Sequence, residues 1–512
     1  MNLFMKKIIL SFGFCLSVFF ASAQSGYNIT INLKNCKDTI AFLTYYQFDK
    51  TLIKDTCTSI KNGRIVFKGK KQLDKGIYSL VSQQKSIYFD FFIDDQTQTL
   101  ELQNDLNANN IEGLSAVNSP HENVFIDYLK FINKQNTDFQ LYRNTSVIKT
   151  KKDSLLLTNK QRELEQRIQE YEQNFLTKNK STFIADVLNL KMEKVLKDIP
   201  KASNGRPDSL MVYKYYKKHY WDNVDFQEDG TMRNPFFYPK LKKYFESVII
   251  THPDSVIVEV DRILDKTKQG SLLYKIMLSH LIYTYETSNR MGFDKVFVHI
   301  ADRYFKTGKA VGIYDDESVV ERIIKRANLL RPLLIGSAAP DLSMIKAEDF
   351  ETVKKMGFEA AKTSEEATKI YYSNADALNK MFSHLYSVSA DFIVLVFWDV
   401  DCGHCQKEIP KLIDLYNELK KDKKDVKVYS VYTLHEGDKY LKYIAEKGLN
   451  DWINVYDGAH LNNVINKYDV FSTPVIYILD KNKIIKAKRI GVEQIKDVIK
   501  EMELEYTKNK GN

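Results

Sequence analysis

One stretch of the sequence decides the fold of the C-terminal part of the chain: Phe392-Ile-Val-Leu-Val-Phe-Trp398-Asp-Val-Asp401-Cys402-Gly403-His404-Cys405. Its first seven residues are apolar and mostly β-branched or aromatic, which predicts a buried strand. The strand delivers two cysteines, with two residues between them, to the predicted first turn of a helix. Unpaired N–H groups at a helix N-terminus carry partial positive charge, which stabilises a thiolate. The pair is therefore a candidate for cycling between dithiol and disulfide.

A Cys-x-x-Cys pair also supplies two of the four ligands of many zinc sites, so a zinc site is the alternative. A tetrahedral zinc site needs further ligands, and the sequence has no second Cys-x-x-Cys. The nearby histidines, His435 and His460, do not have the spacing of a zinc site. The ligand count disfavours zinc, and we expect no metal.

Residues on both sides of the cysteines resemble those of thioredoxin-fold proteins. Phe397-Trp398 stands before the motif, and Pro410 falls inside the predicted helix. Far downstream, Thr473-Pro474 is similar to the cis-proline loop that lies opposite the cysteines in that family. The resemblance implies a C-terminal thioredoxin fold, an α/β/α sandwich.

Two further segments narrow the resemblance to periplasmic TlpA-like thiol–disulfide oxidoreductases of the Bacteroidetes type. Glu408 and Pro410 complete the pattern Cys-x-x-Cys-x-x-Glu-x-Pro, which recurs in that group. The segment from Gly336 to Pro340 is similar to the Gly-x-x-Ala-Pro entry segment of the same proteins. The resemblance runs from Gly336 to the C-terminus, with an unusual insertion near residues 347–387.

The resemblance implies a role for each residue of the motif and of the proline loop. Cys402 is expected to attack a substrate disulfide, and Cys405 to resolve the mixed disulfide by intramolecular attack. Pro474, if cis, would hold the backbone of Thr473 beside the sulfurs, where a substrate strand can pair with it. Trp398 is the third residue expected at the substrate-binding surface.

Two ionisable residues are expected to tune the cysteines. Thioredoxins carry a buried aspartate at the position of Val396, so Glu408 is the remaining candidate for accepting the proton of Cys405. The alternative is an ordinary helix glutamate. His404 is expected to stabilise the Cys402 thiolate and so make the disulfide more oxidising, since Gly-His is also the dipeptide of protein disulfide isomerases.

The N-terminus has the outline of a secretory signal peptide over residues 1–23. Lys6-Lys7 is followed by an apolar run over residues 8–20 and by Ala21-Ser-Ala23, a small-residue cleavage site. The run is short for a membrane span, which needs about 20 residues, although an uncleaved anchor is the alternative. We therefore expect a periplasmic protein, in a compartment that permits disulfides.

Outside the motif, Cys36 and Cys57 are the two cysteines that would remain after signal cleavage. An even count in an exported chain makes them a candidate structural disulfide, with two buried free thiols as the alternative.

Between the signal and the C-terminal domain, the sequence predicts two more domains. Residues 24–118 contain short β-prone runs separated by turns, which predicts a β-rich domain. Residues 119–334 have helical spacing and many aromatics, which favour an ordinary helical core over a surface that grips other proteins. The thioredoxin-like domain follows over residues 335–512. The expected fold class is multidomain α+β.

Composition excludes little else. The chain has 512 residues and a net charge of +9, and its charged residues are distributed along the sequence. The sequence contains no nucleic-acid-binding motif. The leading prediction is an enzyme that exchanges disulfides with exported protein substrates and needs no cofactor beyond its own cysteines. Its expected partners are those substrates and a membrane thiol reductant or oxidant. An envelope protein-binding module with a redox-sensitive clamp is the alternative, whereas a peroxiredoxin is disfavoured because Asp399 replaces the Thr or Ser three residues before Cys402.

Overall fold

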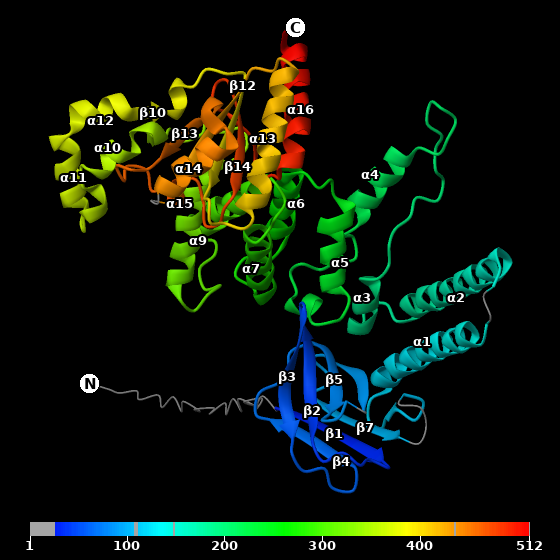
Figure 1. Cartoon of the computed structure of the whole chain (residues 1–512). Coiled ribbons are helices and arrows are strands. Elements are labelled where there is room, and N and C mark those ends of the chain that lie inside the picture. Colours follow the sequence, from blue (N-terminus) through cyan, green and yellow to red (C-terminus); the bar gives the residue numbers. More distant parts are fainter. Residues whose placement is uncertain (1–25, 86, 107–110, 147–148, 435–436, 511–512) are drawn as a thin grey trace, which may run out of the picture. The chain divides into compact units, whose positions relative to one another are not determined.

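The computed structural model describes residues 26–85, 87–106, 111–146, 149–434 and 437–510 (Figure 1). The chain divides into two compact units, with the boundary between Val248 and Ile249. This boundary falls within residues 119–334, which the sequence predicted as one helical domain. The predicted signal peptide lies outside the described residues. Within the described part of the chain, no helix combines the length and apolarity that a membrane span requires.

The first unit begins with eight strands in two four-stranded sheets, with the orders β4-β1-β7-β8 and β3-β2-β5-β6. Alternating buried side chains of β1, among them Ile29 and Ile31, pack with Leu43 and Phe91 from the other sheet in one apolar cluster. The strands are β1 (Tyr27–Lys34), β2 (Ala41–Gln47), β3 (Lys50–Cys57), β4 (Arg64–Gly69), β5 (Gly76–Ser82), β6 (Tyr88–Ile93), β7 (Thr99–Asp105) and β8 (Ser115–Ala116). The predicted β-rich domain is thus present.

Helices complete the first unit. Ser119 caps the first of them, and Thr150 and Asp153 form a reciprocal capping box at the second. The aromatic residues Tyr220, Trp221 and Tyr244 are buried against one another, as expected of a helical core. The helices are α1 (Pro120–Thr145), α2 (Lys151–Lys178), α3 (Phe183–Asn189), α4 (Ser209–His219) and α5 (Phe237–Lys243).

The second unit begins with four more helices, α6 (Pro253–Lys266), α7 (Leu272–Glu286), α8 (Asp294–Ile300) and α9 (Glu317–Leu330). The carboxylate of Asp261 on α6 lies 2.9 Å from Nε2 of His299 and accepts a hydrogen bond of 2.8 Å from the hydroxyl of Tyr304. These contacts tie α6 to α8 and to the turn of π-helix that continues it.

A seven-stranded sheet forms the centre of the second unit, in the order β10-β9-β13-β12-β11-β14-β15. Strand β11 is buried along its whole length, between β12, which is parallel to it, and β14, which is antiparallel. The strands are β9 (Ser343–Lys346), β10 (Phe382–His384), β11 (Phe392–Trp398), β12 (Val426–Tyr432), β13 (Ile453–Tyr456), β14 (Val475–Asp480) and β15 (Ile485–Lys488). The predicted fold class, including the C-terminal thioredoxin-like domain, is confirmed.

The helices of this domain are α10 (Phe350–Lys354), α11 (Ser364–Ser373), α12 (Ala375–Met381), α13 (Cys405–Lys421), α14 (Gly437–Lys447), α15 (Val464–Lys467) and α16 (Val492–Lys510). Helices α13 and α16 run side by side and pack on one face of the sheet (Figure 1). The segment that the sequence marked as an insertion contains α10 to α12 and adds Phe350 and Leu378 to the core on that face.

Candidate functional site

The two cysteines lie where the central strand of the sheet ends and helix α13 begins. Strand β11 ends at Trp398, and the helix starts at Cys405, three residues later than the sequence predicted. The carbonyl of Cys402 still accepts a helical hydrogen bond of 3.0 Å from the N–H of Gln406. Cys402 is half-buried, whereas the side chain of Cys405 is only 1% exposed. Both residues are thiols in the structure.

The loop before β14 lies directly against the first cysteine. The peptide bond between Thr473 and Pro474 is cis. The thiol of Cys402 donates a hydrogen bond of 3.2 Å to the carbonyl oxygen of Thr473, and the N–H of Cys405 donates one of 3.4 Å to the Cys402 sulfur. The structure therefore brings together Cys402, Cys405, Thr473 and Pro474, four of the residues singled out in the sequence.

The two thiols have opposite tendencies to ionise. Burial opposes ionisation of Cys402, but hydrogen bonding from the side chain of Thr473 and from the backbones of Cys405 and His404 outweighs it and lowers the pKa of Cys402. Burial raises the pKa of Cys405 to about 12. Because the thiolate is the nucleophile, Cys402 is the thiol equipped to attack, and Cys405 needs help to lose its proton.

Asp399, which the sequence analysis did not assign to the site, lies beside both sulfurs. One carboxylate oxygen of Asp399 and the sulfurs of Cys402 and Cys405 all lie within 4.8 Å of one another. Oδ2 of Asp399 accepts a hydrogen bond of 2.8 Å from the hydroxyl of Thr473, and Oδ1 accepts one of 3.0 Å from the N–H of Asp401. An acidic residue immediately after a fully apolar strand was the sequence signal for it.

The two residues predicted to tune the cysteines lie at the edge of the site. The side chain of Glu408 is 24% exposed and its carboxylate accepts a hydrogen bond of 2.6 Å from Nζ of Lys411, on the next turn of α13. His404 is exposed. Glu408 is not part of the group formed by Asp399 and the two sulfurs among the described residues. The proton-acceptor role of Glu408 therefore stays a prediction.

Trp398 is placed differently from the expectation that it contacts substrate. Its side chain is 1% exposed, and its indole N–H donates a hydrogen bond of 2.8 Å to the hydroxyl of Ser430. Its ring contacts Tyr440 and Tyr443 of helix α14 edge-on or tilted. A side chain enclosed in this way anchors the end of strand β11, because Trp398 is its last residue. The segment that carries the two cysteines begins directly after it.

A cleft of about 730 Å³ lies beside the cysteine motif within the second unit. His404, Glu408 and Pro474 line it, together with residues of helices α7 and α9 and of the turn after α7. On α9, Arg326 forms an ion pair with Asp469, whose carboxylate also pairs with Arg489. The helices that precede the thioredoxin-like domain thus contribute to the surroundings of its active site.

Three of the described residues could supply metal ligands at this site. Asp399, Cys402 and Cys405 present three ligand atoms, whereas a structural zinc site takes four. The described histidines do not join this group. We assign no metal to it.

The candidate structural disulfide lies in the first unit. Cys36 and Cys57 are both half-buried thiols, and both pack against the apolar cluster between the two sheets. Their pairing stays a prediction.

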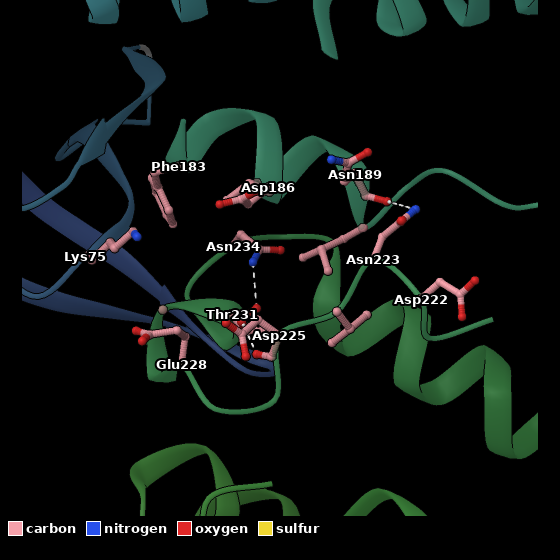
Figure 2. A pocket seen from close by; sticks show the side chains of 14 residues that line it. Lys75, Phe183, Asp186, Asn189, Asp222, Asn223, Asp225, Glu228, Thr231 and Asn234 are labelled. Carbon is pink, nitrogen blue, oxygen red and sulfur yellow. Dashed lines mark hydrogen bonds between the residues drawn. The ribbon is translucent and has the colours of Figure 1, made fainter. Parts of the chain in front are cut away.

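A second cavity, of about 460 Å³, lies in the first unit (Figure 2). Asp186, Asp225 and Glu228 line it, with Lys75 placed 5.0 Å from the centre of the Phe183 ring. Burial raises the pKa of Asp186. The acidic lining alone does not indicate a reaction.

Comparison with family models divides the chain into three parts. A model described as thioredoxin-like matches residues 390–485. Two models described as domains of unknown function, DUF4369 and DUF5106, match residues 27–125 and 156–323. No match was found among curated proteins.

Several solved structures are similar to parts of the chain. A domain of a possible thiol-disulfide isomerase from Cytophaga hutchinsonii has 32% sequence identity, and the match covers 35% of this chain and 98% of that one, with a TM-score of 0.27. A thioredoxin-like protein from Bacteroides caccae has 18% identity over 59% of this chain and 98% of that one, with a TM-score of 0.41. The thioredoxin domain of a thiol-disulfide oxidoreductase from Bacteroides vulgatus has 21% sequence identity. That match covers 33% of this chain and 96% of the other, with a TM-score of 0.24.

Proposed function

The chain belongs to the thioredoxin-like family through its C-terminal domain, and from this premise we propose that it exchanges disulfides with protein substrates through Cys402 and Cys405. The observation that carries the proposal is the contrast between the two thiols. Cys402 lies against the carbonyl of Thr473 with a lowered pKa, while Cys405 is buried with a raised pKa. This contrast suits a pair in which one thiol attacks and the other resolves.

In the reducing direction, the thiolate of Cys402 attacks one sulfur of a substrate disulfide. The substrate S–S bond breaks, one substrate thiolate leaves, and Cys402 is joined to the substrate by a mixed disulfide. Cys405 then loses its proton and attacks the sulfur of Cys402. The second substrate thiolate leaves and takes up a proton, so that the substrate gains two electrons and the Cys402–Cys405 dithiol becomes a disulfide.

The proline loop supplies the surface on which the substrate is held. The hydrogen bond between Cys402 and the Thr473 carbonyl places backbone polar groups of this loop beside the attacking sulfur. An extended substrate segment can pair with this exposed backbone through main-chain hydrogen bonds. Such bonds do not depend on the side chains of the substrate, so substrates of many sequences can bind. Thr473 and Pro474 are therefore the substrate-binding residues of the proposal, and Trp398 supports them from the core.

The proposed setting is the periplasm, because the predicted signal peptide at residues 1–23 would export the chain to a compartment that permits disulfides. The electrons would pass between protein substrates and a membrane thiol reductant or oxidant, without an organic cofactor. The direction of flow depends on the reduction potential of the Cys402–Cys405 pair relative to that partner.

Reduction of insulin by the full chain, with dithiothreitol as the electron source, tests the proposal. We expect the wild-type chain to accelerate insulin reduction and Cys402→Ser to abolish the acceleration. A chain with Cys36→Ser and Cys57→Ser is the matched control and should keep the activity, because these cysteines lie outside the thioredoxin-like domain. Full activity of the Cys402→Ser chain would contradict the proposal. Binding of envelope proteins that survives loss of both active-site cysteines would favour the binding-module alternative.

A further inference from the structure

The second step of the proposed reaction requires Cys405 to lose its proton. Its side chain is 1% exposed, so bulk water has little access to the sulfur. Burial raises the pKa of this thiol to about 12, and a protonated thiol is a poor nucleophile. The mixed disulfide can be resolved at a useful rate near neutral pH only if a base close to Cys405 takes its proton.

Asp399 is a carboxylate in the right place. One of its oxygens lies within 4.8 Å of both cysteine sulfurs, a separation that a single water molecule can bridge. The backbone of Asp399 also hydrogen bonds to the sulfur of Cys405, so the two residues are in direct contact. Asp399 directly follows Trp398, the last residue of the buried strand β11, and so lies at the start of the segment that carries the cysteines.

The surroundings of Asp399 leave its carboxylate able to accept a proton. Each carboxylate oxygen can accept about two hydrogen bonds. The structure gives Oδ2 the Thr473 hydroxyl, at 2.8 Å, and Oδ1 the N–H of Asp401, at 3.0 Å. These two donors orient the carboxylate and leave capacity on both oxygens. The contact with Thr473 also joins Asp399 to the loop on which the substrate is held.

Glu408, the candidate from the sequence motif, is placed less favourably. Its carboxylate accepts a hydrogen bond from Lys411 at 2.6 Å and faces the cleft beside the motif. Among the described residues, Glu408 also does not join the group in which a carboxylate oxygen of Asp399 and the two sulfurs lie within 4.8 Å of one another.

We propose that Asp399 accepts the proton that Cys405 loses when it attacks the mixed disulfide. The proton passes from the Cys405 thiol to the Asp399 carboxylate, the S–S bond between Cys402 and the substrate breaks, and the bond between Cys402 and Cys405 forms. The departing substrate thiolate then takes the proton, which returns Asp399 to its ionised state. This role rests on the proposed disulfide exchange and names the group that drives its second step.

The aromatic disulfide DTNB separates the two steps in one stopped-flow experiment on the reduced full chain at pH 7. Attack by Cys402 releases one coloured thiolate, and resolution by Cys405 releases the second. The signal of a chain with Cys402→Ser and Cys405→Ser is subtracted to remove any reaction of other thiols. We expect Asp399→Asn to slow the second phase by about 10²-fold, the low end for general-base assistance. The first phase should be unchanged or faster, because a neighbouring negative charge disfavours the Cys402 thiolate.

Two further variants separate a chemical role of Asp399 from a structural one. Asp399→Glu keeps a carboxylate and should retain most of the second-phase rate, whereas a merely structural role would leave it as slow as Asp399→Asn. Asp401→Asn is the matched control, since Asp401 is exposed and its carboxylate lies 2.8 Å from Nζ of Lys439. It should leave the second phase within about twofold of wild type.

The outcomes distinguish the two proposals. A slow second phase in Glu408→Gln together with a normal one in Asp399→Asn would overturn the role of Asp399 and assign the proton to Glu408. Equal slowing of both phases in Asp399→Asn would also overturn it, because damage to the fold acts on both steps. Absence of the first phase in the wild-type chain would instead contradict the proposed disulfide exchange itself.

Discussion

Arg326 of helix α9 forms an ion pair with Asp469, five residues before the cis-proline, with Nη2 and Oδ2 separated by 2.9 Å. The carboxylate of Asp469 is only 3% exposed, and it also pairs with Arg489. The guanidinium of Arg326 lies 5.7 Å from the ring of Phe471, an exposed residue of the same loop. A helix that precedes the thioredoxin-like domain in sequence thereby holds the loop on which we place the substrate.

We predict that Arg326→Ala destabilises the chain and slows insulin reduction. The change leaves a buried carboxylate with one cationic partner instead of two, at a cost of about 1–3 kcal/mol. Arg322→Ala is the matched control, because Arg322 is exposed on the same helix and contacts Ser318; it should change stability by less than about 0.5 kcal/mol. Urea unfolding and the insulin assay measure the two effects. Equal behaviour of the two variants would show that the ion pair does not hold the loop.

The two active-site thiols should differ strongly in reactivity. Alkylation requires the thiolate, so the lowered pKa of Cys402 should shift the pH at which its alkylation rate is half-maximal below that of an ordinary thiol. Cys405, with a pKa of about 12, should stay protonated and react slowly between about pH 6 and 9. Iodoacetamide pulses followed by peptide mass spectrometry test this prediction, with urea-unfolded protein as the control. Equal rates for the two cysteines in the folded chain would refute it.

His404 should make the active-site disulfide more oxidising. A protonated imidazole between the two cysteines stabilises the thiolate of the reduced form. We therefore expect His404→Ala to shift the reduction potential to more negative values by tens of millivolts, where about 30 mV corresponds to 1.4 kcal/mol. Equilibration with glutathione buffers gives the potential. Lys407→Ala, which removes an exposed cation that also lines the cleft, serves as the control. An unchanged or less negative potential in the His404→Ala chain would argue against this role.

Cys36 and Cys57 should be joined in protein purified from an oxidising compartment. Both pack against the same apolar cluster, and a bridge would close a loop of about twenty residues, worth roughly 3 kcal/mol in the chain-entropy model. Peptide mass spectrometry without reduction should find the linked pair. Two thiols that react freely with an alkylating reagent in the native, air-oxidised protein would show that no bridge forms.

The sequence predicted most of the C-terminal domain correctly, for identifiable reasons. The apolar run Phe392–Trp398 predicts a buried strand, and β11 has the predicted bounds. The start of α13 was predicted three residues early, because a Cys-x-x-Cys motif does not reveal where regular helical geometry begins.

The site was less accessible to sequence reasoning than the fold. Cys402, Cys405 and the Thr473–Pro474 loop follow from a motif, but Asp399 joins the site only through the folded position of its carboxylate, one oxygen of which lies within 4.8 Å of both sulfurs. The burial of Trp398 depends on contacts with α14, which lies about forty residues away in sequence. The pairing of Arg326 with Asp469 joins residues 143 positions apart. Contacts over such separations leave no local pattern.

The most direct test of the central claim is the trapping of the mixed disulfide. Reduced full chain with Cys405→Ser, incubated with insulin, should accumulate one insulin chain bound through Cys402, seen as a mass increase that disappears on reduction, because the resolving thiol is missing. The Cys402→Ser chain should trap none under the same conditions. An adduct that forms through Cys405 in the Cys402→Ser chain, or no adduct in either chain, would contradict the account.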